Sequence, residues 1–134
     1  PRYLEDMLRV IKYEKLSLVF CSRYERGGGS LDDDFITRIG NFFFSKFGNI
    51  FFSLKISDIL FTYFLAKKED LEKLKLKSDN YCLCVEIPIK SKKNNLNYKT
   101  IPCIERKRFA DKKKVKPFKV GLQILIYMIK KIFN

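Results

Sequence analysis

The sequence predicts an α/β domain, and three observations support this class. Apolar residues recur at helical spacing from Leu4 to Ile11, which predicts an amphipathic helix ending near Glu14. The apolar run Leu16–Cys21 has the composition of a buried strand. Tyr98–Ile104 follows an asparagine-rich turn and has the composition of a second strand. Helices and strands therefore alternate along the chain.

The composition disfavours a disordered tail and favours partners that carry phosphate. The chain has 134 residues, of which 46% are hydrophobic and 15% aromatic, enough to form a core. Its 28 Lys and Arg residues outnumber 15 Asp and Glu residues, which gives a net charge of +13. Such a charge favours nucleic acid, nucleotide sugars, lipid phosphates or an anionic membrane surface. Charge alone does not choose among these partners.

The cysteines favour reduced thiols in a cytosolic protein. They are unevenly spaced, and because the chain has no His, a zinc site would need all four. The four are Cys21, Cys82, Cys84 and Cys103. No signal peptide begins the chain, which starts at Pro1 without an initiator Met. We therefore expect it to be part of a longer protein.

The middle of the chain is predicted to be mostly helical. Phe35–Leu65 is rich in Phe and Ile, but charged residues interrupt every window long enough to cross a bilayer. We therefore expect this segment to be helical and either buried or lying at an interface. Ala66–Lys77 alternates acids and lysines and has the pattern of a solvated helix. Cys82–Ile89 alternates as a strand does, but Pro88 permits only a helix start, a kink or a sheet edge. This segment stays open between strand and helix.

Two loops and a final helix complete the prediction. Glu25–Asp34 contains three glycines and three aspartates, which predicts a mobile loop. Glu105–Lys116 is predicted to be a basic loop. Phe118–Phe133 has one narrow polar stripe on an otherwise apolar helix. It is short for a membrane span, so docking on the domain and lying in the membrane interface both fit.

Arg23 is the first candidate for binding chemistry. It follows the predicted strand and precedes a loop containing Gly27 and Gly28, and Arg38 lies further along the chain. An arginine in this place can hold a diphosphate through two hydrogen bonds while the loop closes over it. The alternative is a surface arginine beside a flexible turn.

A basic segment is the second candidate. Six cationic side chains occupy nine positions from Arg106 to Lys114. Their positive field could bind a pyrophosphate or a lipid phosphate. A solvated loop and a nucleic-acid contact remain alternatives.

Taken in order, these elements resemble the C-terminal half of the family 2 glycosyltransferases. The resemblance is to enzymes like dolichol-phosphate mannose synthase and bacterial polyprenyl-phosphate sugar transferases. Its elements are Ser22-Arg23-Tyr24, Gly27-Gly28, Arg38, Asp58, an acidic helical residue at Glu86, and a closing motif with Pro102, Arg108 and Lys114. Two positions in that motif depart from the family pattern: Asp111 stands where glycine is usual and Lys113 where serine is usual. The segment after Asp58 lacks a common Ser-Gly-Phe.

The resemblance implies a fold and an activity. The fold would be the C-terminal part of a GT-A fold, which is Rossmann-like, with the nucleotide-binding units missing. Residues 1–116 would form the acceptor-side part, and residues 117–134 an amphipathic helix. The whole enzyme would transfer a sugar, with inversion, from a nucleotide-diphosphate sugar to a lipid-phosphate or saccharide acceptor in cell-surface glycan synthesis. Mg²⁺ or Mn²⁺ would bind to upstream aspartates, and we expect this chain alone to be inactive.

The resemblance also implies roles for individual residues. The cations expected at the diphosphate or at an acceptor phosphate are Arg23, Arg38, Arg108 and Lys114, and the loop glycines are Gly27 and Gly28. Asp58 is expected to face the acceptor, as a general base for a hydroxyl acceptor or as a positioning group for a lipid phosphate. The alternative for Asp58 is a helix N-cap.

Two other classes of function compete with this interpretation. In a small basic nucleic-acid-binding module, Lys112–Lys116 and exposed phenylalanines would contact phosphates and bases. Most phenylalanines lie in apolar helical runs instead, so we expect no nucleic-acid partner. In a peripheral membrane protein without chemistry, Phe118–Phe133 would be the anchor. We expect a cytoplasmic protein, with attachment to the cytoplasmic membrane face compatible with either function.

Overall fold

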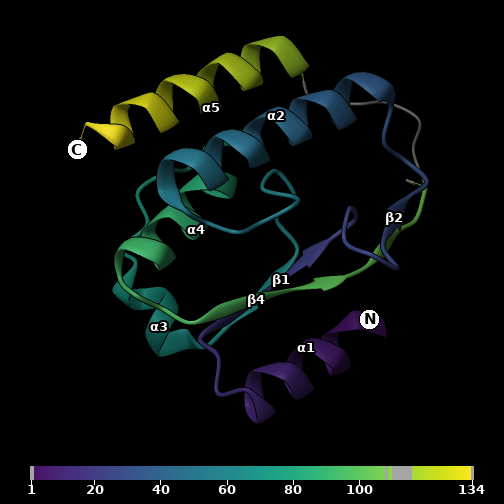
Figure 1. Cartoon of the computed structure of the whole chain (residues 1–134), viewed down its shortest axis with the longest axis vertical. Coiled ribbons are helices and arrows are strands. Elements are labelled where there is room, and N and C mark those ends of the chain that lie inside the picture. Colours follow the sequence, from purple (N-terminus) through teal and green to yellow (C-terminus); the bar gives the residue numbers. More distant parts are fainter. Residues whose placement is uncertain (1, 108, 110–115, 134) are drawn as a thin grey trace.

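The computed structural model describes residues 2–107, 109 and 116–133, and these form a mixed α/β fold with a small open sheet (Figure 1). The predicted α/β class is confirmed. In chain order the elements are α1 (Arg2–Tyr13), β1 (Leu18–Ser22), β2 (Gly29–Ser30), α2 (Phe35–Phe52), β3 (Phe64–Ala66), α3 (Lys68–Lys73), α4 (Leu83–Lys93), β4 (Tyr98–Pro102), β5 (Ile104–Glu105) and α5 (Pro117–Ile132).

Strand β1 is the centre of the larger sheet, which has the order β3-β1-β4. It runs antiparallel to β3 and parallel to β4, with Leu18 opposite Ala66 on one side and Tyr98 on the other. All five residues of β1 are buried, which explains its continuous apolar run. Strands β2 and β5 form a separate parallel pair.

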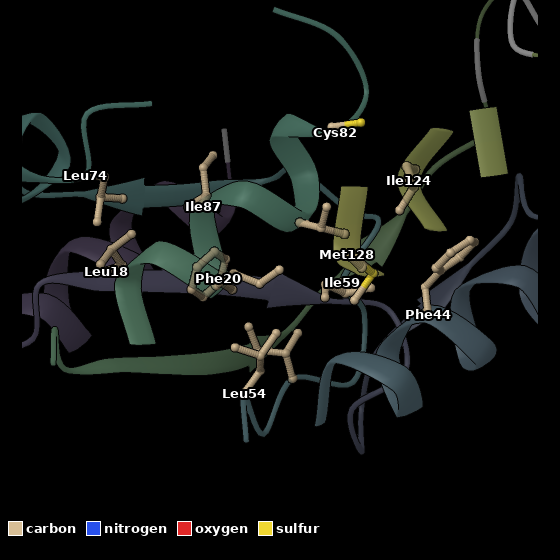
Figure 2. Packing of buried hydrophobic residues seen from close by; sticks show 13 residues of the cluster. Leu18, Phe20, Phe44, Leu54, Ile59, Leu74, Cys82, Ile87, Ile124 and Met128 are labelled. Carbon is tan, nitrogen blue, oxygen red and sulfur yellow. The ribbon is translucent and has the colours of Figure 1, made fainter. Parts of the chain in front are cut away.

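The side chains of β1 alternate between two apolar clusters, because successive residues of a strand face opposite sides of its sheet. Leu18 and Phe20 belong to the larger cluster, which α2, α4 and α5 complete, and Figure 2 shows its packing. Val19 and Cys21 belong to the smaller cluster with Met7 of α1. In Figure 1, α1 lies on one side of the sheet, and α2, α4 and α5 lie on the other.

The prediction of one helical segment over Phe35–Leu65 is wrong in its second half. Helix α2 ends at Phe52, and Ser53 and Lys55 then adopt positive φ angles of 53° and 57°. The following residues form a loop that buries Leu54, and the chain then enters β3. The strand pairing of Phe64–Ala66 with β1 therefore decides the structure at the end of the segment, against the helical pattern of the local sequence.

The predicted solvated helix Ala66–Lys77 is shorter than expected, and the ambiguous segment is helical. Helix α3 covers only Lys68–Lys73, because Ala66 pairs with β1 and Leu74 is buried. The strand interpretation of Cys82–Ile89 is wrong. Helix α4 contains Pro88 in its interior, and five consecutive residues from Val85 to Ile89 are buried there. The free energy gained by burying these side chains exceeds the cost of the backbone hydrogen bond that Pro88 cannot donate within the helix.

Glu86 accepts three hydrogen bonds inside the fold, at the start of α4. Its carboxylate receives the backbone N–H groups of Lys77 at 2.9 Å and Ser78 at 2.7 Å. The Lys90 ammonium lies 2.6 Å from it. Burial raises the pKa of Glu86, but these three donors outweigh burial and bring the pKa down from 4.5 to about 2.

We expect Glu86→Gln to lower the free energy of unfolding at neutral pH by roughly 2 kcal/mol. A carboxylate whose pKa is depressed by folding stabilises fully above its ordinary pKa of 4.5, and the contribution disappears as pH falls toward 2. Urea denaturation between about pH 5 and pH 2.5 should therefore show a shallower loss of stability in Glu86→Gln than in the parent. The exposed Glu69→Gln is the control, and equal slopes in all three proteins would contradict the assignment.

Candidate functional site

Arg23 is buried at the carboxyl end of β1 and is bound to Asp58 by a pair of parallel hydrogen bonds. Its Nε donates to Asp58 Oδ2 at 2.8 Å, and its Nη2 donates to Oδ1 at 2.9 Å. The backbone N–H of Arg23 also donates to Oδ2, at 2.9 Å. Only 6% of the Arg23 side chain and none of the Asp58 side chain is exposed. This two-point contact fixes the plane of the guanidinium.

Two further carboxylates complete what we name the Arg23 cluster, consisting of Arg23, Asp33, Asp58 and Glu105. The Nη1 atom of Arg23 donates to Asp33 Oδ1 and to Glu105 Oε2, each at 2.9 Å. The guanidinium carbon lies 4.4 Å from the centre of the Phe61 ring. Burial alone would lower the pKa of Arg23, but its hydrogen bonds to the carboxylates hold the pKa above its ordinary value. Arg23 therefore stays charged at any physiological pH.

Polar side chains from other elements hold these carboxylates in turn. Asn41 of α2 donates to Asp58 Oδ1 at 2.5 Å, and its own oxygen accepts the backbone N–H of Leu60 at 3.0 Å. Ser30 of β2 donates to Glu105 at 2.6 Å, and the Tyr24 hydroxyl donates to Asp33. Burial and the bond to Asp33 raise the pKa of Tyr24. The cluster thus joins α2, β1, β2 and β5.

The glycines of the loop bring β2 back beside β5. Gly27 has a φ angle of +93°, and the backbone N–H of Gly28 donates to the carbonyl of Glu25 at 2.8 Å. A side chain at Gly28 would place its Cβ only 2.7 Å from the Ser22 carbonyl oxygen. The segment predicted to be a mobile loop therefore has a defined course, with a tight turn and a short strand.

Two of the seven predicted site residues, Arg23 and Asp58, contact each other directly. Gly27 and Gly28 form the turn beside them. Arg38 is exposed on the first half of α2, whereas Asn41 is the α2 residue that reaches Asp58. Arg108 and Lys114 lie outside the described residues.

Asp58 is enclosed, and the N-cap alternative for it is wrong. The residues after it form a turn, in which the Phe61 N–H donates to the Asp58 carbonyl oxygen at 3.3 Å, and no helix begins there. The neighbouring cavity, lined by Asp58, Thr62 and mainly apolar residues, has a volume of about 10 Å³. A cavity of this size holds at most one water molecule. In this arrangement Asp58 contacts its protein partners and leaves no space for an acceptor.

No family model, curated protein or solved structure matches this chain. The resemblance to glycosyltransferases therefore rests on the residues of the chain itself and stays a prediction.

Sequence reasoning missed three members of the site. Asn41 carried a signal, because it is a polar residue within an apolar helical run. Asp33 is the middle one of three successive aspartates, and Glu105 directly precedes the basic segment. For these two carboxylates, local sequence does not indicate a buried partner. Their place depends on the pairing of β2 with β5.

A larger open hollow lies along the β4 edge and does not include the Arg23 cluster. Its volume is about 530 Å³, and its lining includes Lys55, Lys92 and Lys99. Glu25 also lines it and accepts a hydrogen bond from Ser57 at 2.8 Å. The hollow is polar and positively charged, as an anion-binding surface would be.

Within the described ranges, no three Cys, Asp or Glu side chains are arranged to hold a metal ion. The thiols divide between the two apolar clusters, Cys21 and Cys103 in the smaller and Cys82 in the larger. Burial, reinforced by Cys103, raises the pKa of Cys21 to about 12. Buried thiols of this kind react slowly at neutral pH.

Proposed function

We propose that this chain is the acceptor-side part of a family 2 glycosyltransferase. The complete enzyme transfers a sugar from a nucleotide-diphosphate sugar to a lipid-phosphate or saccharide acceptor in cell-surface glycan synthesis. The observation that carries the proposal is the convergence of three segments on which the resemblance rests. Arg23 contacts Asp58, 35 positions away, and Glu105, 82 positions away. Glu105 lies in the closing motif, directly before its basic segment.

The location of the cluster supports the proposal. Strands β1 and β4 are parallel, with Ser22 opposite Pro102 where both strands end. Ligands of open α/β sheets bind outside the carboxyl ends of the parallel strands. The Arg23 cluster lies at these carboxyl ends of β1 and β4.

In this proposal Arg23 and Asp58 are positioning residues. Their buried contact holds the turn at Gly27 and Gly28 on one side and Glu105 on the other. Glu105 is the most exposed of the three carboxylates, at 26%, and Arg106 and Lys107 follow it on the surface. The basic segment, continuing through Arg108 and Lys114, supplies cations for a diphosphate or an acceptor phosphate. A divalent cation held upstream would neutralise the leaving diphosphate.

The test restores the upstream coding sequence and measures transfer from nucleotide sugars with Mg²⁺ or Mn²⁺. We expect metal-dependent turnover, with Arg23→Ala and Asp58→Asn each reducing kcat/KM by about 100-fold or more, because displaced loops misplace the reacting groups. Glu14→Gln, which breaks an exposed ion pair with Lys99, is the control and should retain activity. Circular dichroism establishes that each variant is folded. An upstream region with no Asp-x-Asp motif and no affinity for nucleotide sugars would rule out the proposal.

The second candidate, a basic nucleic-acid-binding module, is favoured by one feature. Phe109 is fully exposed and follows Arg106 and Lys107 in the sequence, so the basic segment contains one exposed aromatic residue. Fluorescence anisotropy with a labelled single-stranded oligonucleotide at physiological salt distinguishes the nucleic-acid-binding module from the glycosyltransferase. Under the glycosyltransferase proposal, we expect only weak, salt-sensitive binding.

A further inference from the structure

Helix α2 carries large apolar side chains on its exposed side as well as in its contact with the core. Its buried residues are Phe44, which belongs to the larger cluster, and Asn41, Ser45 and Gly48, which are polar or small. Its exposed side carries large apolar residues at helical spacing: Phe35, Ile39, Phe42, Phe43 and Ile50. The exposed side of a globular helix ordinarily carries charged and polar residues instead. The exposed apolar side chains of α2 therefore suit contact with an apolar partner outside the domain.

Helix α5 carries a second outward stripe. Its inner side packs through Ile124 and Met128, which are buried in the larger cluster. Its exposed stripe repeats at intervals of three and four residues: Phe118, Leu122, Ile126 and Ile129, with Phe133 directly after the helix. Docking on the domain therefore uses only one side of this helix.

The two helices lie side by side (Figure 1). A Cβ at Gly121 of α5 would lie 3.8 Å from the Phe44 ring of α2, and a Cβ at Gly48 would lie 3.6 Å from Met128. Both distances are those of ordinary van der Waals contacts, so these two positions lie where the helices pack together. We name the exposed stripes of both helices together the α2–α5 face.

The charges on these two helices favour an anionic partner. None of the 15 acidic residues of the chain lies in α2 or α5. The cations of these helices are Arg38, Lys46, Lys119, Lys130 and Lys131. The Lys46 ammonium lies 5.6 Å from the centre of the Phe42 ring, so cation and aromatic ring occupy the same surface. A second copy of the chain would bring like charges together on such a face.

We propose that the α2–α5 face binds flat on an anionic lipid bilayer. The aromatic and aliphatic side chains enter the boundary between headgroups and acyl chains, and the cations contact lipid phosphates. Within the described ranges, no helix is long and apolar enough to cross a membrane, so the contact is with the surface. This inference does not depend on glycosyl transfer, and it places α2 beside α5 in the membrane contact that the sequence indicated for Phe118–Phe133.

The test is flotation of the chain with vesicles of phosphatidylcholine alone or with about 30% phosphatidylglycerol. We expect at least about tenfold tighter binding to the anionic vesicles, lost on raising the salt concentration. Phe42→Ser combined with Ile126→Ser should weaken binding about tenfold or more, because both side chains leave the acyl boundary. Lys46→Glu combined with Lys130→Glu should abolish the preference for anionic lipid.

Tyr13→Ser is the matched control, because Tyr13 is an exposed aromatic residue at the end of α1, on the other side of the sheet. It should bind as the parent does. Equal binding to both vesicle types, or no binding, would overturn the proposal. So would a dimer in analytical ultracentrifugation that Phe42→Ser with Ile126→Ser converts to monomer. All variants are compared by circular dichroism first.

Discussion

Asp58→Asn is expected to lower the free energy of unfolding by about 3 kcal/mol, a large share of the 5–15 kcal/mol typical of a small domain. The carboxylate of Asp58 accepts four hydrogen bonds, three from Arg23 and one from Asn41. An asparagine has one acceptor oxygen, and its NH₂ group would face donors. Buried N–H groups of a charged guanidinium would then lack partners. Urea denaturation followed by circular dichroism measures the loss.

The control for Asp58→Asn is Glu14→Gln, which removes an exposed ion pair. Lys99 and Glu14 are 2.7 Å apart, with 51% and 43% of their side chains exposed. Such pairs contribute less than about 1 kcal/mol. If the two substitutions cost the same, Asp58 is not the buried acceptor described above.

Gly28→Ala is expected to cost about 3 kcal/mol of unfolding free energy. The new Cβ would lie 2.7 Å from the Ser22 carbonyl oxygen and 2.9 Å from that of Arg23. Both atoms are backbone. The Ser22 oxygen is fixed at the end of β1, where it accepts the N–H of Cys103 at 2.9 Å, and the Arg23 N–H is bound to Asp58, so the glycine turn must move instead. Moving the turn also pulls β2 away from β5 and loosens Glu105.

Gly29→Ala is the neighbouring control. A Cβ at Gly29 meets no atom within 4 Å among the described residues, and Gly29 has no positive φ angle. Its stability should stay within about 0.5 kcal/mol of the parent. Equal stability of Gly28→Ala and Gly29→Ala in urea titrations would show that the turn does not approach β1 closely.

The sequence predicts those elements whose burial follows one regular pattern along the segment. Helix α1 buries Met7 and Ile11 at helical spacing, and strand β1 is buried throughout. The end of α2 does not, since Ser53 adopts a left-handed conformation that no glycine marks. Helix α4 keeps Pro88 in its interior because tertiary burial outweighs the local penalty.

The candidate site is predictable only in part. The order of motifs indicated Arg23 and Asp58, which do meet. It could not indicate that carboxylates surround Arg23, because the pairing of the two-residue strands β2 and β5 brings Asp33 and Glu105 next to it. The apolar exposed side of α2 is likewise not predictable from its sequence, because apolar residues outnumber polar ones and the pattern does not show which side is buried.

The central claim is that the buried contact of Arg23 with Asp58 joins the segments of the site. A double-mutant cycle measures it directly, with Arg23→Gln, Asp58→Asn and the combined variant compared by urea denaturation at low temperature. We predict that the two substitutions are strongly non-additive, with a coupling energy of about 2 kcal/mol or more. Additivity within about 0.5 kcal/mol would mean that the two side chains do not interact, and the proposed site would be contradicted.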